Sequence, residues 1–502
     1  MTIDKLTLIG WARATWVSLC LALVACGGGI DGSSVSSNQL SGVGIGDTGL
    51  AEGTVTGFGS VIVDGIEYDD ANASSVQDDG TGTTVNTDLK LGQRVKLTLN
   101  ADNSVASVAV LPQLVGMADT APDTSGSLQV MRQRVRLAGS ASDPTQSPVA
   151  VLAGFGGAGI AAGDLLEIHG SWVLDNQLAG YVLIASRIEK LSVQPALLQL
   201  SGVVQAITGS SLLLNSATGL VIQTASLPTG VVVGHLVRVW LTPTAWHAMS
   251  SNTLQASRVV DGTLTAELLA DKTLRLSGMV ANYNAALRTV EVQGTQIQLD
   301  PKLQLDEQAL ARGAFVSLAI QRSGGILVAS GGTQRGAVGT PSDLGQSVTL
   351  KAITNGIDWS SDPVSLTLRG VSVTAAASTL SASCRQANPN IDLMVEVTGR
   401  WSQIASTVLA SQVQCTPTAS MGQGAASHAT TMRSGIVSKL NLSAHTFSLQ
   451  TAQGVVAVLW DAQTFFSDEF NRYPESLTGQ RVEVEGVNQT GMLRARTIKP
   501  IR

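Results

Sequence analysis

The sequence predicts an all-β protein, built as a tandem array of about six small five-stranded barrels after a signal peptide and a flexible tether. Three observations predict this fold. The 502 residues include 52 glycines, and only 14% are charged, which suits short strands and tight turns more than helices. One strand pattern returns along the chain in the same order. Each recurrence is also flanked by further short strand patterns.

The clearest recurring strand begins at a Gly or Asp and then alternates apolar and polar residues. The aliphatic pairs are Val95 and Leu97, Leu166 and Ile168, Val237 and Val239, Val316 and Leu318, Val395 and Val397, and Val482 and Val484. The residue between each pair is polar: Lys96, Glu167, Arg238, Ser317, Glu396 or Glu483. Because successive strand side chains point to opposite faces, the pattern predicts an inward aliphatic face and an outward polar face in one register.

Further strands complete each copy. In the first copy an opening strand at Gly53 precedes a hairpin that turns at Asp64-Gly65, a strong two-residue hairpin signal. Three copies carry a glycine where a strand is expected to bend at a barrel corner: Gly170, Gly399 and Gly486. Closing five short strands into an OB-like barrel would remove their free edges. A two-sheet sandwich with the same strands is the alternative.

The expected organisation is a lipoprotein signal peptide at 1–25, a Gly/Ser-rich tether at 26–50 and six barrels, which we call modules 1 to 6. The modules cover residues 51–112, 113–192 (a divergent copy), 199–262, 274–331, 346–416 and 431–502. Stretches rich in Gly, Ser and Thr separate modules 4 and 5 and modules 5 and 6. They predict a string of beads with some stiff joints.

The N-terminus predicts the compartment. Lys5 and Arg13 precede an apolar run that ends at Cys26, as in a secretory signal, and the run is too short to span a bilayer. The run Leu23-Val24-Ala25-Cys26 resembles the bacterial lipobox, which implies that Cys26 is lipidated and anchors the protein to a membrane. Since no Asp follows Cys26, the resemblance implies the outer membrane, with the periplasmic or surface side left open. An ordinary signal peptide with an incidental cysteine is the alternative.

Besides the lipidated Cys26, two cysteines would stay in the mature chain, Cys384 and Cys415. In an oxidising envelope they are expected to form one disulfide, which would stabilise the fold by about 3 kcal/mol. A pair of free thiols for redox chemistry is the alternative, although no C-x-x-C spacing supports it.

The runs GTVTGFGSVIVDGIEY at 53–68 and DLKLGQRVKL at 88–97 resemble the bacterial "domain of unknown function 5666" family. Its proteins are lipoproteins with tandem small β-barrel domains. The resemblance therefore implies this fold and an envelope location. No activity is established for the family, so the resemblance implies no mechanism.

Motifs for catalysis, metals or cofactors are missing from the sequence, so we expect neither an enzyme nor a cofactor. The five histidines are scattered without zinc-ligand spacing. Asp78-Asp79-Gly80 supplies only part of a calcium loop, and a solvated loop is the expected reading. The glycine-rich run 154–159 has no following helix and reads as a crossover loop. A net charge of −6 with scattered Lys and Arg argues against nucleic acid as a partner.

Tryptophans offer the remaining candidates. Trp172 and Trp401 fall on the inward phase and are expected to plug their barrels. Trp240 has the opposite phase, on the same face as Arg238. This pair is expected to be an inter-module surface or a ligand surface, or else Trp240 is incidental.

The leading hypothesis is a non-enzymatic, lipid-anchored envelope protein whose barrels form a binding or scaffolding array for an envelope protein or a polysaccharide. A glycan-binding or glycan-acting envelope enzyme is the first alternative, and a passive structural spacer is the second. The aromatic loop of module 6 is the expected contact region, unless it folds over its own barrel. Its aromatic residues are Trp460, Phe465, Phe466, Phe470 and Tyr473.

Overall fold

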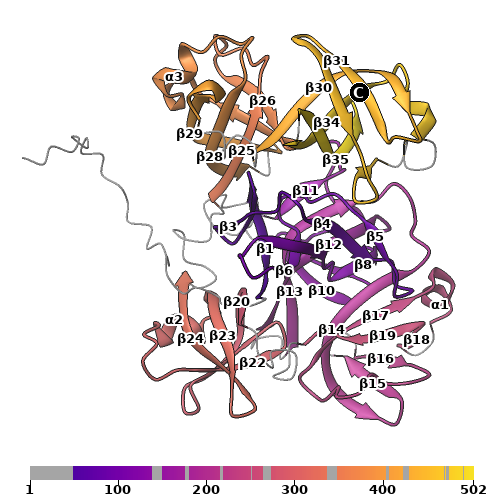
Figure 1. Ribbon diagram of the computed structural model, residues 1–502. Coiled ribbons are helices and arrows are strands. Elements are labelled where there is room, and N and C mark those ends of the chain that lie inside the picture. Colours follow the sequence, from indigo (N-terminus) through magenta and orange to yellow (C-terminus); the bar gives the residue numbers. More distant parts are fainter. Residues whose placement is uncertain are drawn as a thin grey trace, which may run out of the picture. The chain divides into compact units, whose positions relative to one another are not determined.

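The computed structural model describes residues 49–137, 150–175, 180–214, 219–249, 252–263, 273–335, 347–402, 406–421, 429–467, 470, 474–489 and 491–501. The expected signal peptide, almost all of the tether and Cys26 lie outside these residues. Strands dominate the described ranges, which confirms the all-β prediction (Figure 1). The α-helices described there are short: α1 (Pro243–His247), α2 (Glu307–Ala311) and α3 (Ala382–Arg385).

None of the helices in the described part of the chain has the length and apolar content that crossing a membrane requires.

Module 4 is a closed five-stranded barrel (Figure 1). Its strands are β20 (Leu274–Asn284), β21 (Thr289–Val292), β22 (Thr295–Leu299), β23 (Phe315–Ser323) and β24 (Ile326–Arg335). Antiparallel pairs join β20 to β21 and β23, β21 to β22, and β23 to β24. One parallel pair, between β22 and β24, completes the ring. Here the prediction of a small OB-like barrel is confirmed over the sandwich.

Module 6 closes in the same way. Its ring consists of β30 (Thr430–Asn441), β31 (Thr446–Thr451), β32 (Gly454–Leu459), β34 (Arg481–Gln489) and β35 (Met492–Pro500), with the parallel pair between β32 and β35. The short β33 (Phe465–Phe466) adds to β35. Module 3 contains β14 (Leu198–Thr208), β15 (Ser211–Leu214), β16 (Leu220–Gln223) and β17 (Leu236–Leu241). Its last strand is divided into β18 (Thr253–Gln255) and β19 (Arg258–Asp261).

The other modules also contain a parallel strand pair, but their remaining strands differ in number or in pairing. Module 1 contains β1 (Leu50–Phe58), β2 (Val61–Val63), β3 (Ile66–Tyr68), β4 (Ser74–Asp78), β5 (Thr84–Asn86), β6 (Arg94–Leu99) and β7 (Val105–Val110). Module 2 contains β8 (Leu114–Met117), β9 (Ser127–Val130), β10 (Gln133–Leu137), β11 (Val151–Ala153), β12 (Leu165–Asp175) and β13 (Gly180–Lys190). Module 5 contains β25 (Ser347–Thr354), β26 (Val364–Leu368), β27 (Val371–Ala375), β28 (Leu393–Ser402) and β29 (Thr407–Pro417). The parallel pairs are β4–β7, β10–β13 and β27–β29.

The predicted strand register is confirmed. All twelve aliphatic residues of the recurring strand have 0% exposed surface. The polar residue between each pair is half-buried, or buried in the case of Ser317. Fully burying one such aliphatic side chain contributes about 1.5–3 kcal/mol, so each recurring strand stabilises its module through two such side chains.

The predicted bends are also present. The pairing of β12 with β13, β28 with β29 and β34 with β35 shifts register at Gly170, Gly399 and Gly486, respectively. A Cβ atom at any of these glycines would collide with a carbonyl oxygen of the partner strand. Only glycine therefore allows the strands to approach this closely at the bend.

The expectation of beads on a string is wrong, because residues 45–502 form one compact unit. Modules 1 and 5 share one apolar core, modules 2 and 3 share another, and modules 4 and 6 each have their own. Strands also pair across modules, as β1 does with β20 and with β25. The modules pack together because many of their outward polar faces are buried against one another and form ion pairs, instead of facing water.

Arg94 illustrates such a contact. It is 1% exposed, and its Nη2 lies 2.8 Å from Oε1 of Glu52, also in module 1. Its Nη1 donates to the carbonyl of Ser277 in module 4, 3.0 Å away. Its backbone N–H donates to Nδ1 of the buried His169 in module 2, 3.3 Å away. One residue therefore joins three modules.

Candidate functional site

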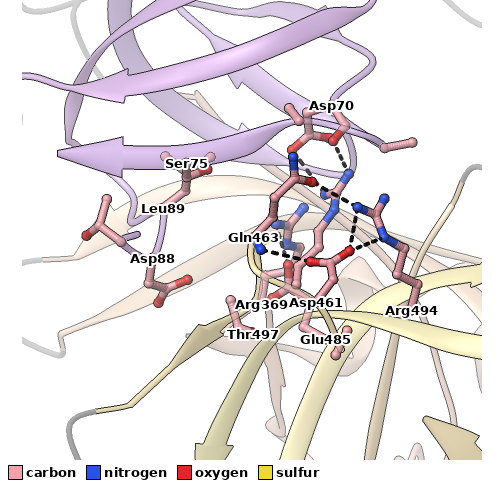
Figure 2. Close-up of a pocket in the computed structure, with 15 residues that line it drawn as sticks. Asp70, Ser75, Asp88, Leu89, Arg369, Asp461, Gln463, Glu485, Arg494 and Thr497 are labelled. Carbon is pink, nitrogen blue, oxygen red and sulfur yellow. Dashed lines mark hydrogen bonds and ion pairs between the residues drawn. The ribbon is translucent and has the colours of Figure 1, made fainter. Parts of the chain in front are cut away.

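Two adjoining hollows lie where modules 1, 5 and 6 meet. The first, which we call the crevice, has a volume of about 40 Å³ and is lined by residues of these three modules (Figure 2). The second, which we call the groove, has a volume of about 900 Å³ and is lined by module 2 as well. Asp88, Leu89 and Arg369 line both hollows.

The crevice is filled by ion pairs. Arg369 pairs with Glu485, Arg494 with Asp461 at 2.8 Å, and Arg496 with Asp70 at 3.1 Å. Figure 2 shows Asp461 and Glu485 among the arginine side chains, facing Asp70 of module 1. A volume of about 40 Å³ holds a few water molecules and no larger ligand. The crevice is therefore a contact between modules and leaves the groove as the candidate site.

Arg369 connects the crevice to the groove. It occupies the first turn position of the hairpin between β26 and β27, with φ +50°, and Gly370 takes the second with φ +70°. This two-residue turn projects the arginine from the tip of the hairpin. The guanidinium lies 4.7 Å from the centre of the Phe58 ring of module 1, and Nη1 donates to Thr430 of β30. Sequence reasoning missed this residue, although an arginine in a tight Arg-Gly turn was a readable signal.

Lys499 and Asp88 pair at the edge of the groove. Burial alone would lower the pKa of Lys499, but Asp88, Glu485 and Glu483 raise its pKa above the usual value. Burial and the neighbouring Glu485 raise the pKa of Glu483. Lys499 is therefore a firmly charged ammonium group within a cluster of carboxylates.

The groove combines aromatic, glycine-rich and charged walls. Three half-buried aromatic residues line it, each from a different module: Phe155, Trp401 and Phe465. Charges of both signs line it too: the carboxylate of Asp88 and the cations Lys90, Arg187, Arg369 and Lys499. The exposed loop at 154–159 forms another part of the wall. The expected crossover loop thus borders a hollow large enough for a ligand.

Every cation that lines the groove already has a carboxylate partner. Lys90 lies 2.7 Å and Arg187 2.9 Å from the two oxygens of Glu189. Arg369 is paired with Glu485, and Lys499 with Asp88. The groove therefore presents neighbouring donors and acceptors, without a field of unpaired positive charge.

Three buried polar atoms in the groove residues lack a hydrogen-bond partner: Nε of Arg369, Nε1 of Trp401 and Oγ of Ser467. An unsatisfied buried polar group costs about 1–3 kcal/mol, and native structures hold few of them. Arg369, Trp401 and Ser467 each bring to the groove one polar atom that the described residues leave unsatisfied.

The two surface residues predicted from sequence lie elsewhere. Trp240 is 4% exposed, and its ring faces the guanidinium of Arg258 at 4.7 Å. It also packs against Gly80 of module 1, near the pair of Arg258 with Asp78 at 2.7 Å. Trp240 thus belongs to a contact between modules 1 and 3, where a ligand has no access to its face. Arg238 is half-buried beside it, and burial lowers its pKa.

The expected disulfide is confirmed: Cys384 in α3 is bonded to Cys415 in β29. Within the described ranges, no group of three or more His, Cys, Asp and Glu side chains is placed to hold a metal ion.

The other aromatic predictions have mixed outcomes. Trp172 is fully buried, and its Nε1 donates to Gln113 and Ser201 at 3.1 Å. Trp401 is only half-buried and lines the groove, so the sequence pattern underestimated its exposure. In module 6, Trp460 and Phe470 are part of the barrel's own core. That loop mainly covers its own barrel, with Phe465 reaching the groove, and Tyr473 lies outside the described residues.

The fold and the groove together define an all-β protein of small OB-like barrels with a ligand-sized hollow between them. Comparison with family models adds one finding. Residues 434–499, which are most of module 6, match the "Domain of unknown function (DUF5666)" family. Comparison with curated proteins finds no match.

Proposed function

We propose that the protein is a non-enzymatic binding protein of the bacterial cell envelope, held at the outer membrane by a lipid on Cys26. The observation that carries the binding function is the groove of about 900 Å³, whose walls come from four modules. Ligand sites usually occupy about 300–1,000 Å³ and lie between domains, as this groove does. The modules then act together as one framework around the ligand.

The chemistry of the groove supports binding over catalysis. Among the described residues, its lining includes no histidine and no cysteine, and the carboxylate of Asp88 is held by Lys499. The lining serines Ser372, Ser406 and Ser467 therefore have no free general base among the described groove residues. A glycan-acting enzyme would need such a group free to move protons.

The envelope location rests on the sequence. A short charged and apolar leader ends at Leu23-Val24-Ala25-Cys26, which resembles a lipobox. Replacing Cys26 by Ala, or treating cells with the signal-peptidase inhibitor globomycin, should change the protein's size and release it from membranes. A variant that stays fully membrane-bound would contradict lipid anchoring.

The binding function is tested by pull-down. Detergent-solubilised full-length protein is immobilised and exposed separately to envelope proteins and to envelope polysaccharides. Retention of either that is lost in Trp401→Ala would place binding at the groove. Leu287→Ala is the control, because Leu287 is 62% exposed and lies outside the groove. Failure to retain anything would favour the passive spacer.

A further inference from the structure

Resting on the proposed binding function, we infer that the groove binds an oligosaccharide of uncharged sugars. The inference follows from three features of its walls: aromatic faces, paired charges and unpartnered polar atoms.

The aromatic residues provide flat apolar surface in an otherwise polar hollow. Phe155, Trp401 and Phe465 are half-buried, so part of each side chain reaches the groove. A sugar ring presents C–H groups on its faces and hydroxyls around its edge, and an aromatic face can cover the C–H side. Because the three residues come from modules 2, 5 and 6, they suit a chain of several sugars more than one ring. OB-like barrels serve as oligosaccharide-binding folds in general.

The paired charges select against a charged ligand. Each of the four cations in the lining already has a carboxylate within ion-pair distance. An anionic sugar would compete with those carboxylates and would also meet Asp88. Single-stranded nucleic acid needs unpaired Lys and Arg along its phosphates, which the described lining residues do not offer. A hydroxyl group donates and accepts at once, so it can bridge Lys499 and Asp88 without breaking their pair.

The unpartnered atoms give the ligand hydrogen bonds that the unliganded wall lacks. Nε of Arg369 and Nε1 of Trp401 can only donate, and Oγ of Ser467 can donate or accept. All three are closed off from solvent, so a small side-chain rotation must accompany binding. Sugar oxygens seated against the wall would then satisfy these groups. A purely apolar ligand would leave them unsatisfied.

The probes are three neutral hexasaccharides (cellohexaose, maltohexaose and chitohexaose), one acidic hexasaccharide (hexagalacturonate) and a dodecathymidylate. Binding to the full-length protein in detergent is measured by calorimetry and tryptophan fluorescence at about 50 mM and about 500 mM NaCl. We expect at least one neutral probe to bind, with a Kd that changes less than about twofold between the two salt concentrations. Tighter binding of hexagalacturonate or dodecathymidylate, weakened by salt, would overturn the inference.

Variants locate the binding. Trp401→Ala should weaken binding of the neutral probe at least about tenfold, while Trp401→Phe, which keeps an aromatic face, should restore most of it. Leu287→Ala should bind as the wild type does, and circular dichroism verifies that each variant is folded. If no probe binds but the pull-down retains an envelope protein through the groove, the inference fails and the proposed function stands. If Trp401→Ala and Leu287→Ala never differ in either experiment, both fail.

Discussion

The interior of each barrel and the contacts between barrels are both buried, yet they are built from different chemistry. Inside the barrels, aliphatic pairs such as Val482 and Val484 are fully excluded from water. Between the barrels, buried arginines and carboxylates pair instead, as Arg369 of module 5 does with Glu485 of module 6. The interior thus depends on apolar area, whereas the contacts depend on having every charge matched.

This difference determines how each region should fail. An apolar core loses stability in proportion to the area and volume disturbed, and it tolerates no charge. A buried ion pair contributes little net stability when intact, because removing both ions from water is costly, but it is expensive to break halfway. Core damage should therefore unfold a barrel, while contact damage should loosen the barrels from one another.

The largest effect is expected from a charge placed inside a barrel. Val482 is fully buried, so Val482→Asp should cost more than about 4 kcal/mol and unfold module 6. Urea unfolding followed by circular dichroism measures the loss. The adjacent Arg481 is exposed, so Arg481→Gln should stay within about 0.5 kcal/mol of the wild type. Equal stability of the two variants would show that the inward register is wrong.

A smaller but still large effect is expected from breaking the buried ion pair of Arg94, the arginine that joins modules 1, 2 and 4. Arg94→Met removes the partner of Glu52 and should lower the free energy of unfolding by about 3 kcal/mol. This loss is at the low end for buried pairs, because the charge of Arg238 also attracts the Glu52 carboxylate. The double variant Arg94→Met, Glu52→Leu should recover much of the loss. A double-mutant cycle from urea unfolding measures this coupling. Losses that simply add would contradict a matched pair.

The next effect concerns pH. Burial alone would raise the pKa of Glu189, but Arg187 and Lys90 lower it to about 2. An unfolded glutamate has a pKa of about 4.3, so the stabilisation is fully present above about pH 5 and is lost as the pH falls towards 2.

The comparison of wild type with Glu189→Gln isolates this contribution, since the other acidic groups titrate in both proteins. The difference in the free energy of unfolding should be constant between about pH 5 and 8 and should shrink between about pH 4.5 and 2. A difference that persists unchanged to pH 2 would show that Glu189 is not held by Arg187 and Lys90.

The contrast between interior and contacts also explains what the sequence could predict. Apolar alternation is a local signal, so the strands, their inward faces and the bends at Gly170, Gly399 and Gly486 could all be found. The disulfide followed from the two cysteines that remain once Cys20 is assigned to the predicted signal peptide and Cys26 to the predicted lipid attachment. The parallel pairs that close modules 4 and 6 join strands distant in sequence, so no local pattern reports them.

The contacts between modules and the groove could not be predicted from the sequence for a similar reason. Lys499 and Asp88 are 411 residues apart, and a polar residue on an outward strand face looks the same whether it meets water or another module. The linkers rich in Gly, Ser and Thr therefore predicted separate beads on a string. Trp240 was noticed for its outward phase, yet that face is covered by module 1. Trp401, read as inward, is the tryptophan that lines the groove.

The smallest effect is expected from an ion pair of the same chemistry at the surface. Arg288 and Glu307 lie 3.0 Å apart, with side chains 34% and 51% exposed. Water screens this pair, so Glu307→Gln should cost less than about 1 kcal/mol, including the loss of a negative charge in the first turn of α2. Added salt should reduce the effect further, while Arg94→Met should hardly respond to salt. If Glu307→Gln and Arg94→Met lowered the free energy of unfolding equally, burial would not be the reason why the ion pair of Arg94 is costly to break. Pairing of buried charges would then not explain how the modules are held together.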